Sequence, residues 1–137
     1  MRRIHVITLT ILITAVLLAF LIRFNSDSDN GAMKHVNPDD AVELVKNSPE
    51  LKIIDVRTAR EFNSGSIPPA INIDVEQPQH FREKIGDLDP DKTYLVFCRA
   101  ANRSRVAVSE MQSAGFDNVI NFNGPVEQMQ QVWQAVN

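Results

Sequence analysis

The stretch Tyr94–Arg105 reads YLVFCRAANRSR and joins an apolar run to a polar, basic segment. Its first part, Tyr94–Phe97, is a short apolar and aromatic run, which is typical of a buried strand. From Ser104 to Ala114, apolar residues recur at roughly helical spacing, which predicts a helix. Cys98, the single cysteine of the chain, therefore lies at a turn between a strand and a helix.

The turn that follows Cys98 is suited to an anion. Backbone N–H groups of a turn and of a helix start point toward one place, and the helix dipole adds positive potential there. Arg99 and Arg103 add two fixed positive charges and fork-shaped donors that suit an oxyanion. We expect a thiol in this place to ionise more readily than a free cysteine and to act as a nucleophile. The alternative is a buried structural cysteine at a strand end.

The loop Cys98–Ser104, with the sequence CRAANRS, resembles the active-site loop of rhodanese-like domains, single-domain sulfurtransferases whose loop is close to CRxGxRS. Only four residues separate Cys98 from Arg103. Cysteine phosphatases have five residues between the cysteine and the arginine, and the phosphatase and arsenate-reductase members of the rhodanese superfamily also have this longer loop. The shorter loop is similar to the kind that accommodates a sulfane-sulfur donor and a persulfide. Ala101 stands where the family often has glycine, and a positive φ at this position would cost alanine about 1 kcal/mol or more.

A second stretch of resemblance runs from Asp55 to Asn72. It contains DVR, then EF, then GSIPPAIN, and is similar to the family pattern DVR, EF, GHIxGAxN. Ser66 stands at the usual histidine and Pro69 at the usual glycine. These departures, together with Ala101, keep a catalytically silent rhodanese-like module open as an alternative to an enzyme.

Asp55 and Arg57 lie at the end of a predicted buried strand, 51–56. We expect both to support the loops rather than to catalyse. A carboxylate at a strand end satisfies backbone donors, and Arg57 is expected to pair with Glu61. The alternative roles are a catalytic acid for Asp55 and a substrate binder for Arg57.

Residues 1–23 combine a basic start, Met1–Arg3, with the apolar segment 4–22. This segment of 19 residues would reach ~28 Å as a helix, enough to cross the hydrocarbon core of a bilayer. It is longer than the apolar region of an ordinary signal peptide, and no small-x-small cleavage site follows it. We predict a transmembrane anchor, with a cleaved signal as the alternative. The basic start favours a cytoplasmic N-terminus and so a periplasmic or otherwise extracytoplasmic domain.

Residues 24–34 are rich in Asn, Ser, Asp and Gly and predict a flexible linker. From residue 35 to 137, predicted strands and helices alternate, which indicates an α/β domain with a largely parallel sheet and helices on both faces. The resemblance implies the rhodanese-like fold with five strands. We predict strands at 35–36, 51–56, 71–73, 93–97 and 119–122, and helices at 38–47, 58–62, 78–88, 104–114 and 125–136.

The net charge of −3 argues against a nucleic-acid partner, and one cysteine excludes an intramolecular disulfide and a cysteine-rich zinc site. We expect no metal and no organic cofactor. The partners implied by the resemblance are a thiosulfate-like anion as sulfur donor and a thiol or cyanide as acceptor. A phosphatase or arsenate reductase is a further alternative, which the loop length disfavours.

The resemblance implies a sulfurtransferase that works through a Cys98 persulfide. Arg99 is expected to attract the anionic donor at the rim of the site. Arg103 is expected to point inward and to brace the loop backbone or the leaving sulfite. Ser104 is expected to cap the helix that follows. The predicted donor-binding loop consists of Arg99, Ala100, Ala101, Asn102 and Arg103.

Overall fold

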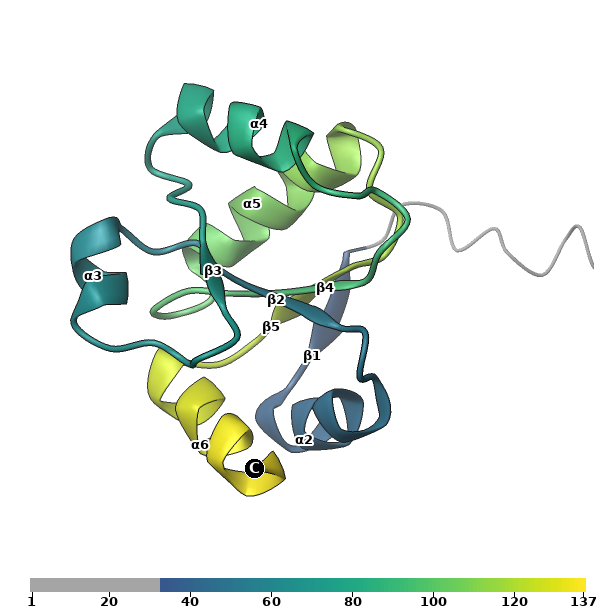
Figure 1. Cartoon of the computed structure of the whole chain (residues 1–137), viewed down its shortest axis with the longest axis vertical. Coiled ribbons are helices and arrows are strands. Elements are labelled where there is room, and N and C mark those ends of the chain that lie inside the picture. The colour runs from purple at the N-terminus through teal and green to yellow at the C-terminus, as the bar shows by residue number, and fades with distance from the viewer. Residues whose placement is uncertain (1–32) are drawn as a thin grey trace, which may run out of the picture. The chain divides into compact units, whose positions relative to one another are not determined.

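A parallel sheet of five strands organises residues 33–137, the part of the chain that this computed structural model describes. The strand order is β1-β5-β4-β2-β3, and every neighbouring pair is parallel (Figure 1). The strands are β1 (Lys34–Val36), β2 (Lys52–Asp55), β3 (Ile71–Asn72), β4 (Tyr94–Phe97) and β5 (Val119–Phe122). The helices are α2 (Pro38–Asn47), α3 (Ala59–Asn63), α4 (Pro78–Gly86), α5 (Asn102–Ser113) and α6 (Val126–Val136).

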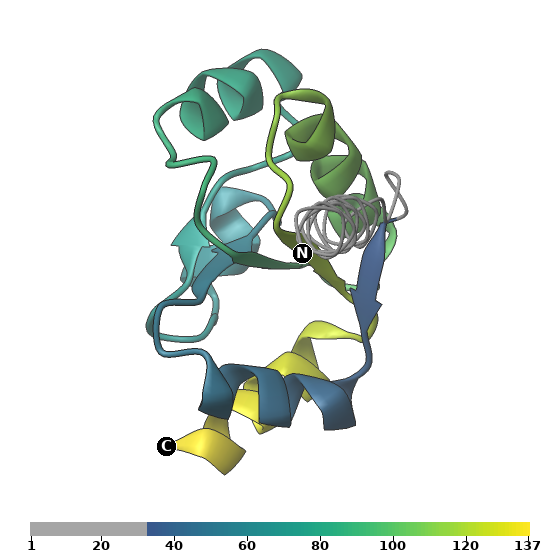
Figure 2. The ribbon, with the colours of Figure 1, turned by 90° about the vertical axis from the view of Figure 1, so that its right-hand side faces the viewer.

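Helices cover both faces of the sheet. Figures 1 and 2 show α4 and α5 on one face and α2 and α6 on the other. The central strand β4 is buried along its whole length for this reason. Tyr94 and Val96 pack toward α4 and α5, whereas Leu95 and Phe97 pack toward α2 and α6. The predicted α/β class, with a parallel sheet between helices, is confirmed.

The order of the strands places β4 in the middle of the sheet, between β5 and β2. The chain leaves β2 for the edge strand β3 and then returns past β2 to form β4. In open α/β sheets, ligands bind beyond the carboxyl ends of strands near such a change in strand order. Cys98 is the first residue after β4 and lies at that edge.

Two helix ends carry the capping residues typical of such positions, and a third differs from the sequence prediction. Asn37 caps α2, since its Oδ1 accepts a hydrogen bond of 2.9 Å from the backbone N–H of Asp40. Gly115, with φ of 93°, follows the last turn of α5, as expected for a left-handed helix end. The prediction that Ser104 caps α5 is wrong. Ala101 adopts a left-handed conformation that starts the helix at Asn102, so Ser104 falls inside the first turn.

The predicted anchor at residues 1–23 and most of the predicted linker lie outside the described residues. Within residues 33–137, no helix has the length and apolar character needed to span a bilayer. Lys34, the last residue of the predicted linker, belongs to β1 and pairs with Ile120 of β5. The sheet therefore begins one residue earlier than the sequence indicated.

Candidate functional site

Cys98 lies where β4 ends and is almost completely buried, with 1% of its surface exposed. Its thiol donates a hydrogen bond to Ser104 Oγ at 3.5 Å. Ser104 is also fully buried, and its hydroxyl donates to the backbone carbonyl of Ala101 at 3.1 Å. A chain of two hydrogen bonds thus links the sulfur, the first turn of α5 and the turn of the loop.

Ala101 carries the conformational strain of the loop. Its φ of 63° and ψ of −7° are left-handed, and it is the one non-glycine residue of 33–137 with a positive φ. Position 101 therefore does have the positive φ that glycine adopts most easily, and alanine occupies it here. A Cβ there costs about 1 kcal/mol.

The start of α6 supports the loop from the other side. The backbone N–H of Val126 donates to the carbonyl of Arg99 at 3.2 Å, and Ala100 forms an isolated antiparallel bridge with Pro125. The side chains of Arg99 and Asn102 are exposed to solvent. Arg99 therefore sits at the surface of the loop, where the sequence prediction put it.

Arg103 does not brace the loop backbone, as the sequence suggested. Its guanidinium forms two hydrogen bonds of 2.8 Å to the carboxylate of Glu61, which comes from α3. A further contact of 3.1 Å joins its Nη1 to Glu76, in the segment that follows β3. The sequence predicts that Arg103 braces the loop or the leaving sulfite. In the structure, its guanidinium is bound by these two carboxylates instead of by the loop backbone.

The Glu61–Arg103 pair shifts the ionisation of both groups. The hydrogen bonds from Arg103 lower the pKa of Glu61 to about 2, against a cost from burial. Glu61 in turn raises the pKa of Arg103, and negative charge on Glu76 and Cys98 acts in the same direction. Glu61 is therefore a carboxylate, and Arg103 a cation, throughout the neutral pH range.

Arg57 pairs with Asp55, so the predicted pairing of Arg57 with Glu61 is wrong. The guanidinium binds both carboxylate oxygens of Asp55, with Nε–Oδ1 at 2.9 Å and Nη2–Oδ2 at 2.6 Å. Glu61 is unavailable because it forms the capping box of α3 with Thr58 and binds Arg103.

Asp55 and Arg57 make the contacts expected of loop-supporting residues. Asp55 accepts the backbone N–H of Arg57 at 3.0 Å, and Arg57 donates to the carbonyl of Gly65 at 2.8 Å. Ser66, which replaces the histidine usual in this pattern, donates to Asp55 at 2.7 Å. The serine therefore keeps a donor at this position. Together the contacts hold the segment between α3 and β3.

Residues 37–131 match the family of rhodanese-like domains. The chain belongs to the rhodanese-like domain family.

Its relatives include named sulfurtransferases. The chain is 30% identical over 93 residues to the thiosulfate sulfurtransferase GlpE of Shewanella oneidensis, an alignment that covers 68% of this chain and 88% of the relative. It is 35% identical over 77 residues to the putative sulfurtransferase YtwF of Bacillus subtilis, covering 56% and 72%. A crystal structure of a rhodanese-related protein from Thermoplasma volcanium is similar, with a TM-score of 0.60 and 31% identity, covering 72% and 92%.

Two site residues of this rhodanese-like domain were missed by sequence reasoning. The sequence predicts no role for Glu76, and it predicts that Glu61 pairs with Arg57, whereas Glu61 binds Arg103. They lie 27 and 42 residues from Arg103 along the chain, and only the folding of α3 and the segment after β3 brings them to α5. The sequence contained one signal for Glu61: Thr58 and Glu61 have the spacing of a capping box.

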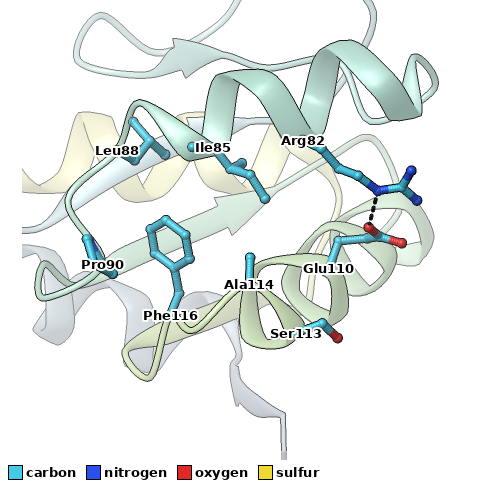
Figure 3. Close-up of a pocket in the computed structure, with 9 residues that line it drawn as sticks. Arg82, Ile85, Leu88, Pro90, Glu110, Ser113, Ala114 and Phe116 are labelled. Carbon is cyan, nitrogen blue, oxygen red and sulfur yellow. Dashed lines mark hydrogen bonds and ion pairs between the residues drawn. The ribbon is translucent and has the colours of Figure 1, made fainter.

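A cleft of about 440 Å³ lies away from this site, between α4 and the C-terminal half of α5 (Figure 3). Ile85, Leu88 and Phe116 form its apolar wall, and the Arg82–Glu110 ion pair lies at its rim. Cys98 precedes the opposite end of α5, so the cleft takes no part in chemistry at the sulfur. Within residues 33–137, no cluster of three or more His, Cys, Asp or Glu side chains could hold a metal ion.

Proposed function

We propose that this rhodanese-like domain is a sulfurtransferase that carries a sulfane sulfur on Cys98. The observation that carries the proposal is the placement of Cys98 at the end of the central strand β4, as the first residue of a short loop that ends in α5. The relative GlpE, named a thiosulfate sulfurtransferase, supports thiosulfate as a donor.

The reaction has two half-reactions. The Cys98 thiol gives up its proton, and the thiolate attacks the outer sulfur of thiosulfate. A new S–S bond forms on Cys98 while the S–S bond of thiosulfate breaks, and sulfite leaves with the electron pair. A thiol or cyanide acceptor then attacks the outer sulfur of the persulfide and regenerates the Cys98 thiolate.

The loop supplies the positive potential for this chemistry. Backbone N–H groups of residues 99–103 and the start of α5 stabilise the negative charge of the thiolate and of the persulfide. Exposed Arg99 attracts the anionic donor at the surface. Because Cys98 is 1% exposed, the loop has to open slightly for the sulfur of a donor to reach it.

The direct test is thiosulfate:cyanide sulfurtransfer by the whole chain beside Cys98→Ser. We expect turnover by the wild type and none above background by the variant. Equal rates would remove Cys98 from the reaction and end this assignment.

A catalytically silent module that binds a partner or senses thiol state is a second candidate. Two observations favour it: the burial of Cys98 and the strained Ala101 in place of glycine. A silent module would gain no sulfur from thiosulfate even in excess.

We also propose that residues 1–23 anchor the domain to a membrane, with the domain on the extracytoplasmic side. The length of the apolar segment 4–22 and the basic residues before it support this placement. Recovery of the full chain in the membrane fraction after a carbonate wash, and digestion of its domain by protease added to spheroplasts, would bear it out. Release by carbonate would contradict the anchor.

A further inference from the structure

The net charge around the Cys98 loop is less positive than its two arginines alone would make it. The loop contains Arg99 and Arg103, yet Arg103 is held by two carboxylates, Glu61 and Glu76. Arg103, Glu61 and Glu76 together carry one net negative charge. Arg103 and Ser104 are consecutive residues in the first turn of α5, and Ser104 contacts the sulfur of Cys98, so the cluster is attached to the same turn of helix that contacts the sulfur.

The two carboxylates make unequal contributions to structure. Glu61 binds Arg103 through two hydrogen bonds of 2.8 Å, completes the capping box of α3 and has a side chain that is 29% exposed. Glu76 makes a single contact of 3.1 Å and its side chain is 54% exposed. Glu61 alone is sufficient to hold the guanidinium. Glu76 adds a negative charge that the geometry of Arg103 does not need.

We propose that Glu76 is a specificity-determining residue of this site, which selects sulfur donors of low negative charge over dianionic donors by giving the Arg103 cluster one net negative charge. The inference rests on the proposed function and deepens it. The favoured donor class is a sulfane sulfur with a monoanionic or uncharged leaving group, such as an aryl thiosulfonate. Cys98 attacks the outer sulfur of that donor, and an aryl sulfinate leaves with the electron pair of the broken S–S bond.

A charge effect of this kind depends on the charge of the donor and on salt. A carboxylate repels a dianion twice as strongly as a monoanion at the same distance, by Coulomb's law. At low ionic strength the removal of one negative charge near the site should raise kcat/KM for a dianionic donor by about 3- to 10-fold. The effect shrinks when the Debye length falls to about 3 Å in 1 M salt.

The experiment compares kcat/KM for thiosulfate and for benzenethiosulfonate in the wild type and in Glu76→Gln. The variant should gain about 3- to 10-fold with thiosulfate and distinctly less with benzenethiosulfonate, and the difference should disappear in about 1 M salt. Glu76→Ala, which also removes the charge, should shift the ratio of the two donors in the same direction.

Glu83→Gln is the matched control. Glu83 is an exposed residue of α4 whose side chain accepts only a hydrogen bond of 3.3 Å from Gln79 in residues 33–137, so its removal changes net charge equally without touching Arg103. It should leave the donor ratio at the wild-type value. An equal shift in Glu83→Gln would overturn the inference, because the effect would then belong to net charge.

Failure of the inference can be told from failure of the proposed function. The mass of the wild-type protein is measured after treatment with each donor. If Cys98 gains sulfur but the donor ratio is the same in wild type and Glu76→Gln, the role of Glu76 is overturned and the sulfurtransferase stands. If neither donor adds sulfur, the proposed function falls and this inference falls with it.

Discussion

Ala101 connects backbone geometry to the chemistry of the loop. Its left-handed φ of 63° is what turns the chain from Cys98 into α5 within a few residues. Its carbonyl also accepts the hydroxyl of Ser104, which in turn accepts the thiol of Cys98. A residue in a strained conformation is thus two hydrogen bonds away from the sulfur of Cys98.

Relief of this strain should stabilise the domain. Ala101→Gly removes the Cβ that opposes a positive φ, and we expect a gain of about 0.5–1 kcal/mol in the free energy of unfolding. Urea unfolding measures it. Ala100→Gly is the matched control: Ala100 has no positive φ, so its replacement should destabilise slightly through the entropy of the unfolded chain. A loss of stability in both variants would show that Ala101 is not strained.

Asp55 and Arg57 form the buried ion pair of the site, with 0% and 5% of their surfaces exposed. Asp55→Asn leaves the guanidinium without its counter-charge, and we expect a loss of about 3 kcal/mol or more. Glu110→Gln breaks the exposed pair with Arg82 and should cost less than about 1 kcal/mol. Thermal or urea unfolding of both variants tests the difference. Equal small losses would mean that Arg57 finds another partner or solvent.

At the scale of elements, Glu61 ties α3 to α5. Its side chain completes the capping box of α3 and binds Arg103 of α5. The pair therefore fixes one wall of the cysteine loop through a contact between two helices.

This contact makes stability depend on pH. The folded protein lowers the pKa of Glu61 from 4.5 to about 2, so the carboxylate stabilises the fold above pH ~4.5 and loses its effect as the pH falls toward 2. Glu61→Gln should lower stability by about 1–2 kcal/mol at neutral pH. The deficit should shrink below pH ~4.5. Urea midpoints of both proteins across this range measure it, and a constant deficit down to pH ~2 would contradict the account.

The elements themselves could largely be predicted from the sequence, because burial on both faces gives β2 and β4 short, continuous apolar runs. The start of α5 could not, since it depends on the left-handed φ of Ala101 rather than on a capping side chain. The partners of Arg103 could not be predicted from the sequence either. Carboxylates 27 and 42 residues away along the chain meet it only in the folded structure.

For the molecule as a whole, the parallel sheet places the carboxyl ends of β2 and β4 side by side. Asp55 pairs with Phe97 in the register of these strands, so the Asp55–Arg57 pair and the Cys98 loop begin at the same edge. Membership of the rhodanese-like family agrees with a sulfur-carrying role for this edge.

The most direct test of this role is the intact mass of the protein after incubation with thiosulfate and removal of the excess donor. We expect a gain of one sulfur atom, located on Cys98 by peptide mapping, lost on addition of cyanide and absent from Cys98→Ser. A wild-type protein whose mass does not change, while its thiol remains reduced and the domain folded, would show that Cys98 does not carry sulfane sulfur.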